Sequence, residues 1–226
     1  MLGHDGSHGT TLAEVTRPTT VWAVVVGGGS GQRFVAAKQY ERLGDERVID
    51  RSRRVAESVC DGVVVVVPAD DAEHERAVAG GETRSASVRA GLAAVPDDAD
   101  IVCVHDAARP MAGPELYRRV IEAVRGGADG AVPAVPVSDT IKIVDGEGSV
   151  VATPDRAALV AVQTPQAFRA DMLRKAHAEG GEGTDDAALV EAIGGRVVTV
   201  PGDTSNRKIT DRADLEWANS LLEVER

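Results

Sequence analysis

The chain has 226 residues, of which 43% are hydrophobic and only 3% aromatic, and it carries a net charge of −11. This length and composition are typical of a globular protein whose core is built from aliphatic side chains. The acidic charge argues against a nucleic-acid partner, and no apolar run is long enough to cross a membrane.

The first 19 residues are rich in glycine, threonine and histidine and have neither the basic start nor the apolar run of a signal peptide. We expect residues 1–19 to be a disordered tail and residues 20–226 to form a single domain. The two cysteines, Cys60 and Cys103, lie far apart in the sequence, which favours buried, unreactive thiols over a disulfide or a metal pair. Such thiols are typical of a reducing compartment and predict a cytoplasmic protein.

A short apolar, largely β-branched run at residues 21–26 predicts a buried strand. The residues after it are Gly27, Gly28, Gly29, Ser30, Gly31, Gln32 and Arg33, with Lys38 a little further on. Glycine backbone can pass close to a ligand, and successive N–H groups in such a turn form a concavity that binds anions. With Arg33 and Lys38 beside it, this loop indicates a polyphosphate site. A glycine-rich turn that binds nothing is the alternative.

The rest of the chain alternates strand and helix patterns. We expect strands at residues 62–67, 100–104, 129–137 and 196–200, and helices at residues 48–60, 113–124 and 170–178. Three further helices are expected: one that ends at residue 94, one that follows residues 184–186 and ends at residue 193, and a terminal one that begins at residue 211. Residues 70–79 form a short helix or a helix-like connection. The strand at 62–67 shows no alternation, so both of its faces should be buried, as in a parallel sheet. The two prolines within 129–137 predict a strand that ends early or lies at a sheet edge.

Residues 138–152 interrupt this alternation of strand and helix patterns. Polar and apolar side chains alternate before and after a turn at residues 145–148, so we expect a β-hairpin that is either a lid or a dimerisation arm. On the last helix, Leu215, Ala218 and Leu222 are expected to face the sheet. The whole pattern predicts an α/β fold, a three-layer sandwich with a mostly parallel central sheet and a hairpin excursion.

A second glycine-and-arginine segment, Gly80–Val88, leads into a helix. The free N–H groups at such a helix start can bind an anion. Ordinary capping by Thr83 or Ser85 is the alternative.

The strand at residues 100–104 runs directly into His105 and Asp106. Polar residues at this end of a buried parallel strand lie where open α/β sheets bind ligands. Asp106 can hold a divalent cation beside phosphates. Its alternative role is to cap the following turn, with Arg109 paired to it.

A series of short segments occurs in one order along the chain: Gly-Gly-Gly-Ser-Gly-Gln-Arg, Lys-Gln-Tyr, Gly-Gly-Glu-Thr-Arg-Ser-Ala-Ser-Val, Val-His-Asp-Ala-Ala-Arg-Pro, Ser-Asp-Thr-Ile-Lys, Thr-Pro-Asp-Arg, Gln-Thr-Pro-Gln-Ala-Phe, Thr-Asp-Asp-Ala and Lys-Ile-Thr. Over about residues 21–222 the chain resembles the 2-C-methyl-D-erythritol 4-phosphate cytidylyltransferase family. His-Asp-Ala-Ala-Arg-Pro together with Thr-Pro-Gln is specific to this family and its close relatives, such as ribitol-5-phosphate cytidylyltransferases.

The resemblance implies a Rossmann-like nucleotidyltransferase fold and a specific reaction. A phosphate oxygen of methylerythritol phosphate would attack the α-phosphorus of CTP, and pyrophosphate would leave with the support of Mg²⁺. Such a protein works by positioning its substrates and by stabilising charge on the phosphates. The resemblance also implies a homodimer in which an arm at about residues 138–157 reaches into the partner's active site.

The same resemblance implies roles for individual residues. The glycine loop at residues 27–31, with Arg33 and Lys38, would hold the triphosphate and the transition-state charge. The cytosine would face Gly81, Glu82 and Ser87, and the metal and phosphates would lie at Asp106. The methylerythritol phosphate would be held by Arg109, Thr140, Arg156, Thr184 and Lys208. Of these, Arg156 and Lys208 count, with Arg33 and Lys38, as catalytic.

The chain departs from the family pattern in three places. Val26-Gly27-Gly28-Gly29 stands where Pro-Ala-Ala-Gly is usual, which makes the loop looser. The segment from Arg33 to Lys38 is shorter than usual, with Ala37 in place of a proline. Arg207 replaces an apolar residue before Lys208, where it could add a phosphate contact or misplace the lysine.

The sequence thus predicts a cytoplasmic, Mg²⁺-dependent cytidylyltransferase of non-mevalonate isoprenoid biosynthesis that binds CTP and a phosphorylated sugar alcohol. The nearest alternative is the same chemistry on ribitol phosphate. A nucleotide-binding homologue with impaired turnover is another, because the loop departs from the family pattern. A dehydrogenase is disfavoured, because Gln32 stands where a dinucleotide fingerprint needs its last glycine, and no Gly-Lys pair forms a Walker loop.

Overall fold

The computed structural model describes residues 17–28, 37–178 and 180–224. Its strands are β1 (Val21–Val26), β2 (Arg42–Leu43), β3 (Glu46–Arg47), β4 (Gly62–Val67), β5 (Val78–Ala79), β6 (Ile101–Asp106), β7 (Gly130–Pro136), β8 (Ile143–Val144), β9 (Val150–Ala152), β10 (Val160–Val162), β11 (Gln166–Arg169) and β12 (Val197–Pro201). Its helices are α1 (Val48–Glu57), α2 (Ala72–Glu75), α3 (Arg84–Ala93), α4 (Pro114–Arg125), α5 (Ala170–Ala178), α6 (Asp186–Ala192) and α7 (Arg212–Val224). Short 3-10 helices lie at Lys38–Tyr40, Ala69–Asp71 and Arg156–Ala158.

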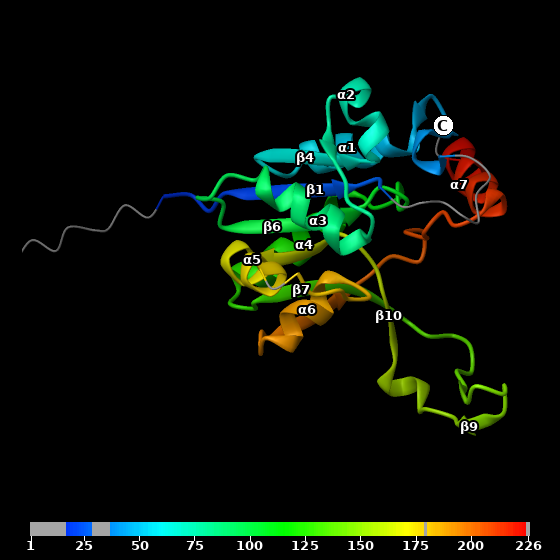
Figure 1. The fold of residues 1–226 in the computed structure, drawn as a ribbon. Coiled ribbons are helices and arrows are strands. Elements are labelled where there is room, and N and C mark those ends of the chain that lie inside the picture. The colour runs from blue at the N-terminus through cyan, green and yellow to red at the C-terminus, as the bar shows by residue number, and fades with distance from the viewer. Residues whose placement is uncertain (1–16, 29–36, 179, 225–226) are drawn as a thin grey trace, which may run out of the picture.

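Eight strands form the main sheet, in the order β10-β7-β11-β6-β1-β4-β5, with β12 paired to β7. β1 lies between β4 and β6 and runs parallel to both, whereas β10 and β11 run antiparallel to their neighbours. Helices α1 and α4 pack on one face of the sheet, and α3, α5 and α6 pack on the other (Figure 1). This is the α/β three-layer sandwich that the sequence predicts.

The centre of the sheet is built from aliphatic side chains buried on both faces. Val24 of β1 and Val104 of β6 are fully buried, and both belong to the core layer under α3. On α3, a Cβ added at Gly91 would lie 2.4 Å from a methyl carbon of Val24. The glycine therefore lets α3 approach β1 closely, which brings the start of α3 to the carboxyl end of β1.

Strand β6 is longer than the sequence pattern indicates. It continues beyond the expected end at residue 104 through His105 and Asp106, which lie in register with Val25 and Val26 of β1. The two polar residues are thus held by the sheet itself. Their positions are fixed by parallel pairing and not by a loop.

Strand β7 corrects one expectation. Despite Pro133 and Pro136 it neither ends early nor lies at an edge, because it pairs with β10 and β11 on one side and with β12 on the other. β11 pairs with the start of β7 and β10 with its end, and between them the carbonyl of Pro133 accepts the N–H of Gln163 at 2.8 Å. Pro133 therefore lies at the point along β7 where its pairing changes from β11 to β10.

The terminal helix α7 corrects a second expectation. Leu215 and Ala218 are buried, but they pack with Leu43 of β2, Val48 of α1 and Ile209 and not against the main sheet. The small β2–β3 hairpin provides this separate apolar surface, which residue spacing on α7 alone could not reveal.

The interruption at residues 138–152 is a β-hairpin. β8 and β9 pair antiparallel, and the carboxylate of Asp145 accepts the N–H groups of Glu147 and Ser149 in the turn. The hairpin projects away from the sheet and its helices (Figure 1). Its apolar side chains are unusually exposed for their type: Val150 is 58% exposed and Val151 59%.

Both cysteines are buried, free thiols in one core layer, as the sequence predicts. A hydrogen bond with Cys60, together with burial, raises the pKa of the Cys103 thiol well above its usual value, so it stays protonated. The expected tail falls on residues outside the described part of the chain, apart from residues 17–19, where Arg17 pairs with Asp100 at 2.9 Å. None of the described helices is long and apolar enough to cross a membrane.

Candidate active site

The strand β1 delivers the glycine loop to the carboxyl end of the sheet. The N–H of Gly27 donates to the carbonyl of Val66 at 2.7 Å, and a Cβ added to Gly27 would lie 2.9 Å from the Ile49 side chain. The start of the loop therefore packs closely against the Ile49 side chain of α1. Gly29, Ser30, Gly31 and Arg33, which the sequence places at the phosphates, lie outside the described residues.

Two adjoining cavities open at this end of the sheet, and Arg84, Asp106 and Lys208 line both. The first has a volume of about 180 Å³ and is lined further by Val26, Gly27, Lys38, Gln39, Ala107 and Ala108. The second has a volume of about 220 Å³ and is lined further by Arg109, Val162, Gln163, Thr164, Gln166, Thr184 and Asp185. The structure therefore gathers six predicted site residues, Gly27, Lys38, Asp106, Arg109, Thr184 and Lys208, around one junction.

Asp106 is the carboxylate at that junction. Its Oδ1 accepts from Arg84 Nε at 3.0 Å, and its Oδ2 pairs with Lys208 Nζ at 2.6 Å. Burial on its own would raise the pKa of this carboxyl, but the charges of Arg84 and Lys208 outweigh burial and hold the pKa well below its usual range. Asp106 is therefore ionised at neutral pH and holds the cationic groups of Arg84 and Lys208 where the two cavities adjoin.

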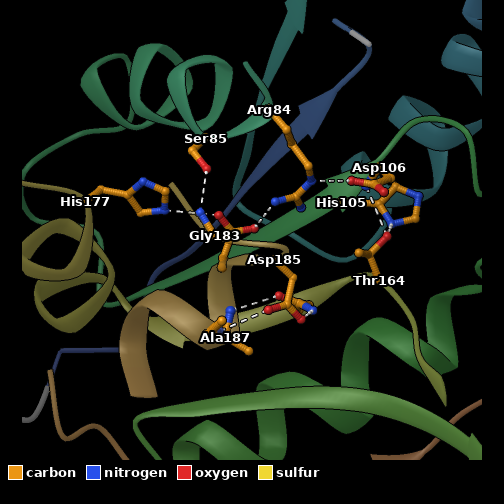
Figure 2. A network of polar contacts seen from close by, with 12 residues as sticks. Arg84, Ser85, His105, Asp106, Thr164, His177, Gly183, Asp185 and Ala187 are labelled. Carbon is orange, nitrogen blue, oxygen red and sulfur yellow. Dashed lines mark hydrogen bonds and ion pairs between the residues drawn. The ribbon is translucent and has the colours of Figure 1, made fainter. Parts of the chain in front are cut away.

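Arg84 lies between two carboxylates (Figure 2). Besides Asp106, it contacts Asp186 with Nη1 at 2.8 Å from Oδ2. Burial would lower the pKa of this guanidinium, but Asp186 and Asp106 outweigh that and raise it. Its Nη2 is buried and has no hydrogen-bond partner among the described residues, so it offers a desolvated donor suited to an anionic ligand.

The Gln-Thr-Pro-Gln segment connects the walls of the second cavity. Gln163 donates to the carbonyl of Asp203 at 2.7 Å, which fixes the loop that precedes Lys208. Gln166 donates to Asp185 at 2.8 Å, which fixes the start of α6. The peptide between Thr164 and Pro165 is cis. This segment therefore holds two separate parts of the site together, a role that the sequence motif did not disclose.

Thr164 also contacts the buried His105. Its hydroxyl accepts the N–H of Asp106 at 3.0 Å and lies 3.1 Å from His105 Nδ1. A neutral His105 ring can accept the hydroxyl proton at Nδ1. Burial, opposed by the charge of Asp106, lowers the pKa of His105 to about 4 and agrees with this assignment.

We expect the neutral His105 to make stability depend on pH. An unfolded chain protonates this histidine below about pH 6.5, whereas the folded chain does so only near pH 4. The contribution is fully present above pH 6.5 and falls by roughly 3 kcal/mol as the pH is lowered to 4. Urea unfolding at several pH values should show a shallower slope in His105→Asn, which keeps an acceptor near Nδ1. The exposed His74→Asn should keep the wild-type slope, and an unchanged slope in His105→Asn would refute the assignment.

The predicted cytosine-binding residues lie beside the first cavity without lining it. Ser87 Oγ lies 3.2 Å from the N–H of Gly81 and donates to the carbonyl of Thr83 at 3.0 Å. A Cβ added at Gly28 would lie 3.2 Å from the same hydroxyl, so the glycine loop and the start of α3 are in contact. Glu82 is exposed. Thr83 also caps α3 through the N–H of Ala86, so the capping alternative holds for this residue.

Two predicted substrate residues are not brought to the cavities. Thr140 and Arg156 are exposed on or beside the projecting hairpin, and Arg156 donates to the carbonyl of Ser138 at 3.0 Å. Neither lines either cavity within this chain. A third feature, Arg207, does not misplace Lys208. It packs over the ring of Trp217, 4.6 Å from the centroid, while Lys208 reaches Asp106.

Sequence reasoning missed Arg84, Thr164 and Asp186 as members of the site. All three stand in segments that the sequence singles out, but residue type alone could not separate a cavity-lining arginine or a buried aspartate from ordinary capping residues. Asp186 lies next to the N-cap Asp185, and nothing in the local sequence distinguishes it from an ordinary acidic residue in the first turn of a helix.

Comparison with known proteins places this geometry in a family. The family model described as 2-C-methyl-D-erythritol 4-phosphate cytidylyltransferase matches residues 21–224. The enzyme of that name from Rhodococcus jostii (strain RHA1) is 44% identical over 216 residues, which cover 90% of this chain and 95% of the relative. The enzyme of that name from Nocardia farcinica (strain IFM 10152) is 49% identical over 179 residues, which cover 75% of this chain and 77% of the relative.

Solved structures agree with the sequence relatives. The crystal structure of the Thermus thermophilus enzyme is similar with a TM-score of 0.75 at 34% identity, over 88% of this chain and 98% of that one. The 4-diphosphocytidyl-2C-methyl-D-erythritol synthase of Anaerococcus prevotii gives a TM-score of 0.80 at 28% identity, over 91% and 99%. Sequence, fold and the order of the site segments together show that this chain belongs to the 2-C-methyl-D-erythritol 4-phosphate cytidylyltransferase family.

Proposed function

We propose that this protein transfers the cytidylyl group of CTP to 2-C-methyl-D-erythritol 4-phosphate and releases pyrophosphate. The observation that carries the proposal is the set of cations around one ionised carboxylate: Lys38, Arg84, Arg109 and Lys208 line the two cavities that meet at Asp106. Two cavities that share a cationic junction suit two phosphorylated substrates whose phosphates must meet.

The reaction needs no covalent bond to the enzyme. The acceptor's phosphate oxygen forms a bond to the α-phosphorus of CTP while the bond to the pyrophosphate oxygen breaks, so charge on the phosphates must be balanced throughout. We assign Lys38, with Arg33 and the N–H groups of residues 27–31, to the triphosphate and its transition-state charge. Lys208, Arg109 and Thr184 hold the acceptor phosphate in line, because they lie on the second cavity.

We assign the cytosine to Gly81, Glu82 and Ser87. The contact between Ser87 and the N–H of Gly81 supports this, because it holds the Gly81 backbone at the start of α3, and Gly28 after β1 lies next to the same hydroxyl. Backbone and hydroxyl groups held in this way can pair with the polar edge of a base, whereas a flexible loop could not do so without an entropic cost.

We propose Mg²⁺ as the accompanying ion. The described residues contain no group of three metal-ligating side chains, and Asp106 is the one carboxylate that lines both cavities. This donor set fits Mg²⁺, which commonly binds through one or two carboxylates plus substrate phosphates and water. Both Asp106 oxygens contact cations in this structure. When substrates bind, their phosphate oxygens would give Arg84 and Lys208 other anionic partners and leave Asp106 for the ion. The ion would supply neutralisation of charge on the departing pyrophosphate.

We further propose that the protein is a cytoplasmic homodimer joined through the arm at residues 138–157. The exposed valines and isoleucines of the hairpin support a dimer, since apolar side chains gathered on a projecting arm are typical of protein interfaces. Arg156 and Thr140 would then serve the partner's cavities. The free buried thiols fit a reducing compartment.

Base preference tests the cytidylyl assignment. We expect CTP to exceed UTP in kcat/KM by roughly tenfold to a hundredfold, because a buried acceptor that has lost the cytosine amino group costs about 1–3 kcal/mol. Pyrophosphate release with each nucleotide measures the ratio. Equal values would refute the cytidylyl assignment and leave nucleotidyl transfer in place.

The acceptor is tested in the same assay. With CTP fixed, methylerythritol phosphate should outperform ribitol 5-phosphate in kcat/KM, and a reversed order would assign the protein to the ribitol-phosphate branch. Tight CTP binding without pyrophosphate release for any phosphorylated polyol would instead identify a nucleotide-binding homologue with impaired turnover.

A further inference from the structure

A chain of buried contacts stands behind Arg84, on the side away from Asp106 (Figure 2). His177, the next-to-last residue of α5, contacts Asp186 Oδ1 with Nε2 at 3.0 Å. Asp186, the first residue of α6, contacts Arg84 Nη1 with its other oxygen at 2.8 Å. His177 is 3% exposed and Asp186 is fully buried. Neither lines the two cavities of the active site.

The chemistry of these groups fixes the direction of each contact. A carboxylate can only accept hydrogen bonds, so the Nε2 of His177 carries a proton and donates it to Asp186. The imidazole therefore takes one oxygen of Asp186 and leaves the other for the guanidinium. A buried carboxylate without partners would be strongly unfavourable, and these two contacts provide partners for Asp186.

The guanidinium of Arg84 is then held at two of its nitrogens by carboxylates on different elements. Asp106 on β6 takes Nε, and Asp186 on α6 takes Nη1. The contact with Asp106 is a hydrogen bond and the contact with Asp186 is an ion pair, and together they orient the rigid guanidinium fork. Nη1 and Nη2 are both buried without a hydrogen-bond partner among the described residues. Without Asp186, Arg84 could turn and place both donors on Asp106, in competition with Lys208.

We propose that His177 and Asp186 are positioning residues for the transfer reaction: His177 orients the Asp186 carboxylate, which in turn fixes the orientation of Arg84 at the junction of the two cavities. The proposal rests on the proposed function, because it assigns Arg84 to the phosphates. Buried ion pairs contribute little net stability relative to well-packed apolar residues, which favours a role in positioning over one in stability.

Substitutions that keep size but alter the contacts test the proposal. We expect Asp186→Asn and His177→Gln to lower kcat/KM for CTP by about tenfold, the lower end of what partners behind a functional ligand contribute. The control is Arg174→Gln, on the same helix as His177, where the arginine donates to backbone carbonyls of residues 95–97. This control should stay within about twofold of wild type.

The Arg84→Ala background separates positioning from packing. If Asp186 acts through Arg84, then Asp186→Asn should add no further loss of kcat/KM once Arg84 is alanine. A full tenfold loss in that background would overturn the proposal, because it would show that Asp186 acts by another route. Wild-type kcat/KM in both single variants would overturn it as well.

Chemical rescue gives a second readout. His177 lines a separate cavity of about 300 Å³ between α3 and α5, together with Arg89, Leu92, Ala93, Asp97, Arg174 and Ala178. Added imidazole can therefore reach the space left in His177→Ala and restore the N–H donor to Asp186. We expect imidazole to recover several-fold in kcat/KM, and thiophene, a ring without that donor, to recover none. Equal recovery by both would reduce His177 to a space-filling role and overturn its part in the proposal.

The proposal can fail separately from the proposed function. If the wild-type protein released no pyrophosphate from CTP, the proposed function would be refuted. The positioning of Arg84 could still be tested by the NMR signal of its Nε–H group, which is assigned by its loss in Arg84→Lys. That signal should shift in Asp186→Asn and His177→Gln and stay unchanged in Arg174→Gln. An Arg84 signal unaffected by Asp186→Asn would overturn the inference whatever the activity.

Discussion

Replacing Lys38 with alanine is expected to lower kcat by roughly a hundredfold or more, the usual scale for the loss of one preorganised charge stabiliser. Lys38 lines the cavity that Arg84, Asp106 and Lys208 also line, at the end of the strand that leads into the glycine loop. Its ammonium group would balance charge that grows on the triphosphate during transfer. Because that charge is largest in the transition state, CTP affinity should change less than kcat.

Steady-state pyrophosphate release and equilibrium CTP binding measure the two quantities. The control is Lys175→Ala, which removes the same charge from an exposed position on α5 and should retain wild-type kcat. Arg33→Ala should match Lys38→Ala, because the family resemblance gives both cations the same role. Near-normal kcat in Lys38→Ala would show that the shortened loop directs this lysine away from the phosphates, and near-normal kcat in Arg33→Ala would refute the assignment of the loop.

Mixing two inactive variants is expected to restore activity to about one quarter of wild type. The variants are Lys38→Ala, in the cavity, and Arg156→Ala, beside the arm. Arg156 and Thr140 line neither cavity of their own chain, and the hairpin projects away from the sheet (Figure 1). If the arm serves the partner, each active site combines one chain's cavity with the other chain's arm.

The expected fraction follows from symmetry. After joint unfolding and refolding in equal amounts, about half of the dimers contain one copy of each variant. In such a dimer one site collects both lesions, and the other combines an intact cavity with an intact arm. Each variant refolded alone is the control and should stay inactive. If mixed dimers form, as native mass spectrometry would show, and no activity returns, the arm acts within its own chain.

Hydrophobic patterning determined most of the fold. The unbroken valine runs of β1 and β4 have no polar face, so only a sheet covered on both sides could bury them, and the parallel three-layer sandwich followed. Where patterning was wrong, a partner distant in sequence decided the outcome. Pro133 sits inside the sheet because the ladder beside it changes strands there, and α7 packs on Leu43 because β2 offers an apolar surface of its own.

For the site, too, some features followed from the sequence and others only from the tertiary structure. The sequence by itself determined which segments contribute to the candidate site, because glycines, cations and Asp106 stand at strand ends, where parallel sheets bring them to one edge. Only the tertiary structure decided which of them meet. Arg84 stands 22 residues before Asp106, and Asp186 and His177 come much later in the chain, yet the four form one line of contacts. Such pairing depends on how α3, α5 and α6 pack across the sheet, and no local pattern in a single sequence encodes that arrangement.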